Sequence, residues 1–450
     1  MVDFRQLACS LLGSLLFRLS PPGQFVIVGA GSAGLAMLKT LLDLPVETRA
    51  EWDIVLYEQR RDIGGIWCGC QIHHPPPPPK LPETPLYPLL HTDTPVPIMT
   101  YPHFPFPPGT PLFPTHGYIE RYHQDYATHY GLWPYIKLGR YHEPHMVIFP
   151  GQDTWLENNK GGLQREILHS MWYRNPSWYA DRTVIVVGGG PSGVGIASQV
   201  LQYAHRVYLS VRSPPREVPL GRVELKPEIL HFTSDGAVFT DGSTVQDVDT
   251  VLLATGYDLR VPFLEEGGEV IVKPGSNKTD GHKLATNLRY LFPLHQHIFS
   301  LSASYPTNAL AFIGLPRSPY YPIYATSIIA NGSLLALRVE LLRELADSEE
   351  DLRRRGYDPY YVGHKMVNNS TFDYQEGLIK TLRSKEGLPE QNIPFRGWKR
   401  LEALGLAEEW LEGVESEDEW ADLMRRVNAW QRDWEAVHHL VFPDDVLVYS

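Results

Sequence analysis

The sequence predicts an α/β fold with two Rossmann-type dinucleotide-binding domains, and three observations support this prediction. A glycine loop follows an apolar run of strand length within residues 25–34, and a second loop with the same spacing follows a similar run within residues 183–193. The chain has 450 residues, and a single hydrophobic core rarely extends beyond about 300 residues. Two domains are therefore expected.

The first loop opens a predicted strand–helix–strand unit that begins at Phe25 with FVIVGAGSAGLAMLKTLLDL and continues into the strand IVLYEQR. Gly29 permits a tight turn, Gly31 lets the backbone approach a pyrophosphate, and Gly34 lets the helix pack on the strand. The positive end of the helix attracts the anion. Glu58 ends the second strand, where its carboxylate would accept a hydrogen bond from a ribose hydroxyl and would repel a 2′-phosphate.

The second loop repeats this pattern in TVIVVGGGPSGVGIASQVLQ, with Gly188, Gly190 and Gly193 in the same spacing. The strand that follows, RVYLSVR, ends at Arg212 and carries no acidic residue at its end. A guanidinium there favours a 2′-phosphate through charge-assisted hydrogen bonds. The first site is therefore predicted to hold a dinucleotide without that phosphate, and the second site is predicted to hold NADPH.

Between residues 73 and 114 prolines alternate with aromatic residues, and this density is expected to exclude regular helix. Two interpretations stay open for this segment: a polyproline-like surface loop, or a long ordered loop that lines a site. From about Ser327 the spacing of Leu, Ala, Glu and Arg predicts a largely helical region. Its tryptophans are interpreted as the apolar faces of helices that dock on the core.

The composition limits the partners and the location of the protein. A net charge of −12 argues against nucleic acid or an anionic membrane surface as a partner. Three cysteines are too few for a disulfide framework, which predicts a reducing, cytoplasmic location. The apolar run at residues 7–17 leaves a targeting signal open, but no segment has the length of a transmembrane helix. No metal site is expected, and a homodimer is left open.

Taken in order, the motifs resemble those of the flavin-containing monooxygenases, in the soluble form that is similar to dimethylaniline monooxygenase. The matching features lie between about residues 25 and 330. They are VIVGAGSAGL, Glu58, Gly64-Gly65-Ile66-Trp67, LYPLLHTDTPVPIMTYPHFPFP, His169-Ser170 with Tyr173, the second glycine loop, and Ala254-Thr255-Gly256-Tyr257.

The resemblance implies a discontinuous FAD domain of residues 1–174 and 288–450 with a helical C-terminal region, and an inserted NADPH domain of residues 175–287. The implied FAD-binding residues are Gly29, Ala30, Gly31, Ser32, Ala33, Gly34, Glu58, Gly65, Ile66, Trp67, Asp93 and Thr94. The implied NADPH-binding residues are Thr92, Asp93, Gly188, Gly190, Ser192, Gly193, Val194, Gly195 and Arg212.

The implied activity is the NADPH- and O2-dependent oxygenation of a nucleophilic nitrogen or sulfur atom in a small organic substrate, through a C4a-hydroperoxyflavin. Two alternatives use the same fold. One is a Baeyer-Villiger-type monooxygenase that acts on ketones. The other is a catalytically impaired flavoprotein that acts as an NADPH oxidase or as a binding partner.

The chain departs from the family pattern at three places. Asp93, which takes the catalytic position, stands where the family has an asparagine that can donate hydrogen bonds, and an ionised aspartate can only accept them. We therefore expect a slower enzyme that releases more hydrogen peroxide. The family's Phe-x-Gly-x-x-x-His pattern has lost its Phe and Gly upstream of His169, which is given no catalytic role, and Gly195 replaces a commonly acidic residue.

Overall fold

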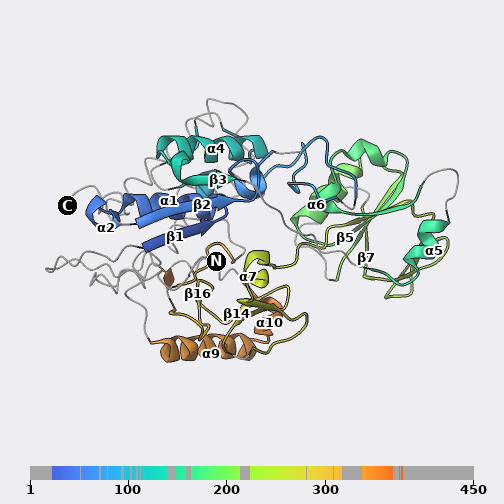
Figure 1. The fold of residues 1–450 in the computed structure, drawn as a ribbon. Helices are drawn as coiled ribbons and strands as arrows, with labels where there is room; N and C mark the ends of the chain where they lie inside the picture. Colours follow the sequence, from blue (N-terminus) through green and yellow to red (C-terminus); the bar gives the residue numbers. More distant parts are fainter. Residues whose placement is uncertain are drawn as a thin grey trace, which may run out of the picture. The chain divides into compact units, whose positions relative to one another are not determined.

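The computed structural model divides the chain into two compact units (Figure 1). The first unit comprises residues 1–68, 94–140 and 259–450, and the second comprises residues 69–93 and 141–258. The structure describes residues 23–50, 52–69, 72–78, 80–92, 96–101, 104–107, 110–111, 113–138, 148–158, 164–212, 223–279, 281–307, 309–316, 337–367, 374 and 377–378.

The first unit contains the predicted strand–helix–strand motif. Strands β1 (Gly23–Val28), β2 (Trp52–Glu58) and β3 (Ile136–Leu138) form a parallel sheet in that order, and helix α1 (Ser32–Asp43) connects the first two. The short helix α2 (Val46–Arg49) follows α1, and α4 (His116–His129) packs on the motif (Figure 1). Leu35, Leu38 and Leu41 recur at helical spacing and are buried, so α1 places one apolar face in the core.

The later part of the first unit is built from short strands and three helices. Strands β12 (Val270–Val272), β13 (Leu284–Thr286) and β14 (Leu291–Phe292) form one sheet, while β15 (Leu294–His295) pairs with β16 (Phe299–Ser300). Helices α7 (Pro262–Glu266), α9 (Arg338–Arg354) and α10 (Pro359–Val362) complete it. The described part of the region after Ser327 is helical in α9 and α10, and the tryptophans of residues 398–434 lie outside the described residues.

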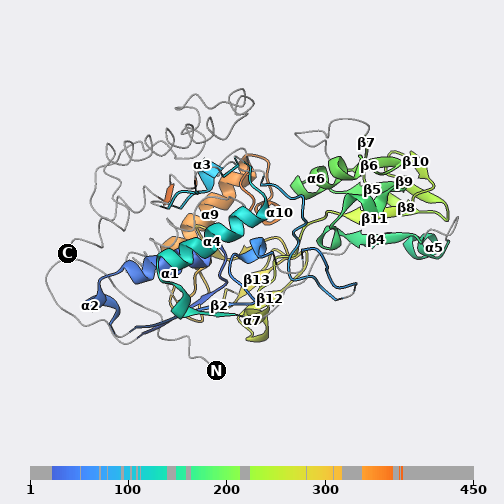
Figure 2. The ribbon, with the colours of Figure 1, turned by 90° about the horizontal axis from the view of Figure 1, so that it is seen from above.

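The second unit is built on a five-stranded parallel sheet, which confirms a second Rossmann-type unit (Figure 2). Its strand order is β4 (Glu166–His169), β11 (Thr250–Leu253), β5 (Thr183–Val187), β6 (Arg206–Ser210) and β7 (Glu224–Lys226). Helix α6 (Pro191–Val200) connects β5 to β6. An antiparallel sheet of β8 (Ile229–Phe232), β9 (Gly236–Phe239) and β10 (Thr244–Gln246) follows, and α5 (Gln152–Glu157) packs against β8.

Strand pairing gives the second unit different limits from the predicted insert of residues 175–287. Strand β4 pairs in parallel with β11, with Glu166 opposite Thr250, so the residues before 175 contribute to this sheet. Strands β12 and β13 instead pair with each other and with β14 in the first unit. The assignment of FAD and NADPH to separate domains stays a prediction.

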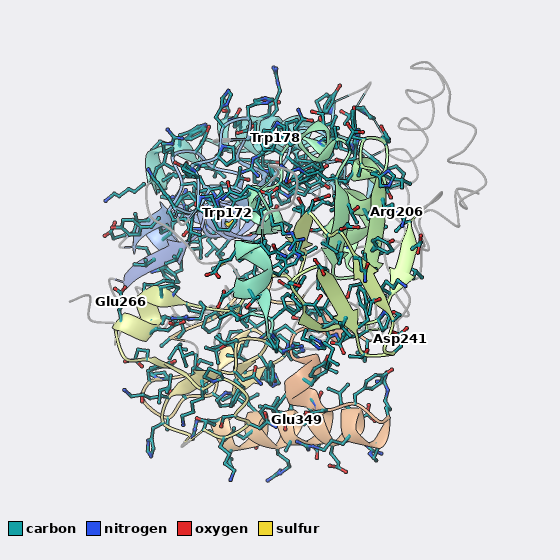
Figure 3. All side chains as sticks on the ribbon, turned by 90° about the vertical axis from the view of Figure 1, so that its right-hand side faces the viewer. Trp172, Trp178, Arg206, Asp241, Glu266 and Glu349 are labelled. Carbon is teal, nitrogen blue, oxygen red and sulfur yellow. The ribbon has the colours of Figure 1, made fainter. Side chains whose placement is uncertain are left out.

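Residues 72–92 of the proline-rich segment are held against the second unit by hydrogen bonds to backbone carbonyls. The Trp172 indole donates to Pro76 O at 3.2 Å, Arg174 Nη2 donates to Thr84 O at 3.0 Å, and Gln199 Nε2 donates to Leu89 O at 3.4 Å (Figure 3 labels Trp172). These contacts favour the ordered-loop interpretation for residues 72–92.

Farther along, one helical turn, α3 (Val96–Met99), contradicts the expectation that the proline-rich segment contains no regular helix. Pro97 lies in the first turn of α3, where the N–H that proline lacks would have no partner within the helix. Short 3₁₀ turns at Gly65–Trp67, Trp133–Tyr135, Ser170–Trp172 and Pro176–Tyr179 complete the described secondary structure.

Two histidines, buried His364 and partly buried His297, lie between β14 and the segment after α10 in the first unit. Leu291 N–H donates to His364 Nε2 at 3.1 Å, so the proton of the neutral His364 ring lies on Nδ1, from which it donates to His297 Nδ1 at 2.9 Å. Burial lowers the pKa of His364 to about 2 and the pKa of His297 to about 4. Both rings are therefore neutral in the folded protein at neutral pH.

These depressed pKa values predict a loss of stability in mild acid. The unfolded histidines bind protons below about pH 6.5, whereas the folded pair does not until the pH approaches 4, so the free energy of unfolding falls as the pH drops from 6.5 towards 4. Each of the two residues contributes about 2 kcal/mol to the loss between pH 7 and pH 5. Urea denaturation of His297→Gln at both pH values should show a correspondingly smaller loss, whereas the exposed His205→Gln should keep the wild-type loss. An equal loss in all three proteins would contradict the prediction.

Candidate functional site: two nucleotide-binding loops

The first glycine loop has the geometry that a dinucleotide pyrophosphate requires. Gly29 adopts a positive φ of 100°, and a Cβ on Gly34 would overlap the carbonyl oxygen of Gly29. Gly31 is the N-cap of α1 and brings no side chain to cap it, and the first turn holds no acidic residue. The N-terminal N–H groups of α1 therefore keep their positive potential for an anion.

A second glycine segment lies directly against this loop. Gly65 adopts a φ of 60°, and a Cβ on Gly65 would lie only 2.9 Å from the Cα of Gly31. Gly64 N–H donates to Ala30 O at 2.9 Å. The structure thus brings together residues that are 34 positions apart in the chain, and only glycine fits at position 65 where they meet. Ile66 is 52% exposed beside this contact.

Glu58 is buried and supports the loop. One carboxylate oxygen accepts a hydrogen bond from Ala30 N–H at 2.6 Å, and the other accepts one from Arg60 N–H at 2.9 Å. A carboxylate has about four lone-pair positions, so these two bonds leave acceptor capacity for a ribose hydroxyl. The residue predicted to contact a ribose therefore also fixes the backbone of the glycine loop.

Sequence reasoning missed three residues that hold or approach this loop. His123 Nε2 lies 2.8 Å from the Ser32 hydroxyl, and the Tyr101 hydroxyl donates to Ser32 O at 2.7 Å. Burial lowers the pKa of His123 to about 4, so this ring stays neutral. A Cβ on Gly314 would lie 3.6 Å from the Ala33 methyl. No local pattern could have revealed them, because between 69 and 281 residues separate each of them from its partner.

The second loop repeats the geometry of the first in the other unit. Gly188 adopts a φ of 121°, and a Cβ on Gly193 would overlap the Gly188 carbonyl oxygen. Gly190 is the N-cap of α6, which has no capping side chain and no acidic residue in its first turn. A Cβ on Gly190 would have no atom of the described residues within 4 Å, so this part of the structure leaves open space at the helix N-terminus.

Tyr87 accounts for the glycine at position 195. A Cβ on Gly195 would lie 3.3 Å from the Tyr87 hydroxyl oxygen, which is tighter than an ordinary contact. Tyr87 is itself buried edge-on against Tyr173, with ring centroids 5.0 Å apart, and burial raises its pKa to about 12. A neutral hydroxyl from the proline-rich segment therefore occupies the space where a larger side chain on α6 would lie.

The strand that ends near Arg212 carries no acidic residue at its end, but the neighbouring strand brings a carboxylate to Arg212. Arg212 Nε lies 3.9 Å from Glu228 Oε1, and both side chains are more than half exposed. Arg212 follows β6, whereas Glu228 follows the neighbouring strand β7. Inspection of the strand after the glycine loop could not reveal a carboxylate that is brought in by the next strand of the sheet.

The remaining residues named from the sequence are distributed as follows. Thr92 is buried in the second unit, while Asp93 and Thr94 lie outside the described residues. His169 Nδ1 accepts from Met171 N–H, so its Nε2–H donates to Gly256 O at 3.0 Å. His169 is thus a buried histidine whose ring nitrogens are hydrogen-bonded within the second unit.

Cys68 is buried and takes part in a disulfide. A reducing location predicts free thiols, and Cys68 departs from that expectation. Among the described residues, no helix is long and apolar enough to cross a membrane.

Comparisons with known proteins agree with this geometry. The sequence profile of the family described as Flavin-binding monooxygenase-like matches three successive segments, residues 23–142, 139–215 and 214–303. The chain belongs to this family. The Arabidopsis thaliana protein named Flavin-containing monooxygenase FMO GS-OX-like 2 is 25% identical over 419 residues, which cover 78% of this chain and 83% of that protein. Flavin-containing monooxygenase 5 of Oryctolagus cuniculus is 23% identical, over 74% of this chain and 78% of the relative.

Two solved structures share the fold of this flavin-binding monooxygenase. S-allyl-L-cysteine S-oxygenase from Allium sativum aligns over 90% of this chain and 98% of its own, with a TM-score of 0.65 and 21% identity. Tmm from Pelagibacter sp. strain HTCC7211 aligns over 81% of this chain and 86% of its own, with a TM-score of 0.59 and 18% identity. Membership in the family implies a flavin cofactor and the use of NADPH, and two uncapped glycine loops fit two dinucleotides.

Two glycines of the second loop should differ in how much they contribute to the stability of the fold. Gly193→Ala forces a methyl group into the Gly188 carbonyl and should destabilise the second unit by about 3 kcal/mol, as overpacking of a rigid contact does. Gly190→Ala meets no protein atom and should leave the stability within about 1 kcal/mol of wild type. Chemical denaturation of both variants measures the difference, and equal stabilities would show that the close approach of α6 is unimportant.

Proposed function

We propose that this flavin-binding monooxygenase uses NADPH and O2 to oxygenate a nucleophilic nitrogen or sulfur atom of a small organic substrate. The observation that carries the proposal is the pair of glycine loops, each at an uncapped helix N-terminus and each beside a different charge. Buried Glu58 supports the first loop, and exposed Arg212 follows the strand next to the second. This contrast favours FAD at the first loop and NADPH at the second.

In this proposal FAD, when bound, supplies the oxygen-activating chemistry, and the chain supplies binding and orientation. The N-terminus of α1 would hold the FAD pyrophosphate, with Gly31 and Gly65 allowing its close approach and Glu58 accepting from a ribose hydroxyl. His123 and Tyr101 would act as positioning residues, because they fix Ser32 in the loop. The N-terminus of α6 and Arg212 would hold the two phosphate-bearing parts of NADPH.

The choice of a nucleophilic nitrogen or sulfur substrate rests on the relatives. One structural neighbour is named for S-oxygenation of S-allyl-L-cysteine. The altered sequence before His169 counts against the ketone-oxidising alternative, because its Phe and Gly are missing. We also propose the predicted division by cofactor, with FAD bound by residues 1–174 and 288–450 and NADPH bound by residues 175–287. The compact units differ from this division because β4 belongs to the second unit and β12 and β13 belong to the first.

The proposed activity is tested by NADPH consumption and product formation with a thioether, a tertiary amine and a cyclic ketone. We expect oxygenated products from the thioether or the amine. For wild type we also expect more NADPH consumed than product formed, with the difference recovered as hydrogen peroxide, because ionised Asp93 cannot donate a hydrogen bond. Asp93→Asn should bring the ratio of NADPH to product at least twofold closer to one.

Each outcome of this assay has a separate meaning. A lactone or ester product from the ketone alone would replace the proposal with the Baeyer-Villiger alternative. NADPH consumption that yields peroxide and no oxygenated product, in wild type and Asp93→Asn alike, would favour the impaired flavoprotein. An unchanged ratio in Asp93→Asn would reject only the role of Asp93.

Flavin retention should depend on Glu58. Glu58→Gln keeps the shape of the side chain but replaces one acceptor oxygen with an NH₂ group, so either Ala30 N–H or Arg60 N–H loses its partner. We expect the affinity for FAD to fall about tenfold, measured by fluorescence titration of the flavin-free protein. Asp53→Asn, which removes an equal charge from the exposed side of the same strand, should bind FAD as wild type does. Unchanged FAD affinity in Glu58→Gln would place FAD elsewhere.

A further inference from the structure

The second nucleotide site carries a carboxylate beside the arginine that is expected to select NADPH. Arg212 Nε and Glu228 Oε1 lie 3.9 Å apart, with 59% and 58% of the side chains exposed. At this separation and exposure the pair is a weak, solvent-screened interaction. Both charged groups are therefore accessible to a ligand.

The backbone fixes where this pair lies. Strand β6 pairs in parallel with β7, with Ser210 opposite Lys226, so Arg212 and Glu228 each follow two residues later on neighbouring strands. The pairing continues past the strand ends, because Val211 N–H donates to Lys226 O at 2.8 Å and the Ser210 hydroxyl donates to Pro227 O at 2.8 Å.

The same strand end is connected to the glycine loop. Gly188 N–H donates to Ser210 O at 2.9 Å, which couples the start of the loop to the end of β6. The carboxyl end of the strand after such a loop is where a Rossmann-type domain contacts the adenosine ribose. Glu228 therefore enters the ribose region from the neighbouring strand, at the edge where Arg212 also lies.

From this arrangement we infer that Glu228 determines cofactor specificity and that the second site accepts NADH as well as NADPH. This inference rests on the proposed function, which places the nicotinamide cofactor there. Arg212 pairs with a 2′-phosphate when NADPH binds. Glu228 accepts a hydrogen bond from the free ribose hydroxyl when NADH binds, and its negative charge opposes the 2′-phosphate.

The chain offers matched controls for both charges. Glu224 begins β7 and is exposed, so Glu224→Gln removes the same charge from the opposite end of the strand that precedes Glu228. Arg206 begins β6 and is exposed (Figure 3), so Arg206→Gln removes the same charge at the end of β6 far from Arg212. Neither control changes the edge where the glycine loop begins.

The experiment is isothermal titration of the full-length, FAD-loaded protein with the oxidised nucleotides NADP+ and NAD+, which report binding without turnover. Wild type should bind both, with dissociation constants within about tenfold of each other. Glu228→Gln should bind NADP+ about threefold more tightly, because the negative charge that repels the 2′-phosphate is gone. The same variant should bind NAD+ about fivefold more weakly, because the charged acceptor for the ribose hydroxyl is gone. Arg212→Gln should lower the affinity for NADP+ about tenfold and leave the affinity for NAD+ within twofold of wild type.

The outcomes separate this inference from the proposed function. If wild type binds NADP+ but the ratio of the two affinities in Glu228→Gln matches that in Glu224→Gln, Glu228 has no role in specificity and the inference is wrong. If wild type binds NADP+ more than a hundredfold more tightly than NAD+, dual acceptance is wrong. If wild type binds neither nucleotide, the proposed function and the inference fail together.

Discussion

The close approach of a helix to the carbonyl oxygen of a glycine is the constraint on which both nucleotide loops depend. In each unit the third glycine of the motif packs on the first, Gly34 on Gly29 and Gly193 on Gly188, at a separation that excludes even a methyl group. This contact sets the angle at which α1 and α6 leave their strands. Because neither helix has a capping side chain, that angle also determines where the free N–H groups point.

The two loops differ in what surrounds them, and this difference gives them different chemistry. Around the first loop the contacts are buried: Glu58 accepts from Ala30 N–H, His123 lies against the Ser32 hydroxyl, and Gly65 touches Gly31. Beside the second loop the charges are exposed, with Arg212 next to Glu228. A loop fixed by contacts to a buried carboxylate suits a cofactor that stays bound, whereas an exposed charge pair suits a nucleotide that exchanges.

The proline-rich segment contributes to the second loop from outside the Rossmann motif. Arg174 is buried and donates to the carbonyl oxygens of Met171, Tyr173 and Thr84, which attaches the segment to the unit. Burial lowers the Arg174 pKa to about 10, a value at which the guanidinium stays charged at neutral pH, and its bonds to carbonyl dipoles hold it. The Tyr87 hydroxyl then lies against α6 at Gly195. The segment thus packs on the helix that is expected to hold NADPH.

Residue order alone predicts the fold class, both glycine loops and the family, because strand, turn and helix patterns are local and their order is specific. It also placed Glu58 and Arg212, since each lies one strand beyond its loop. The contacts of the predicted site residues, by contrast, follow from the folded structure: Gly65 packs on Gly31, His123 lies at Ser32, Tyr87 lies at Gly195 and Glu228 lies at Arg212. These partners come from other strands, helices and loops, 16 to 108 residues away. No local sequence pattern shows which of these distant segments pack against the site residues.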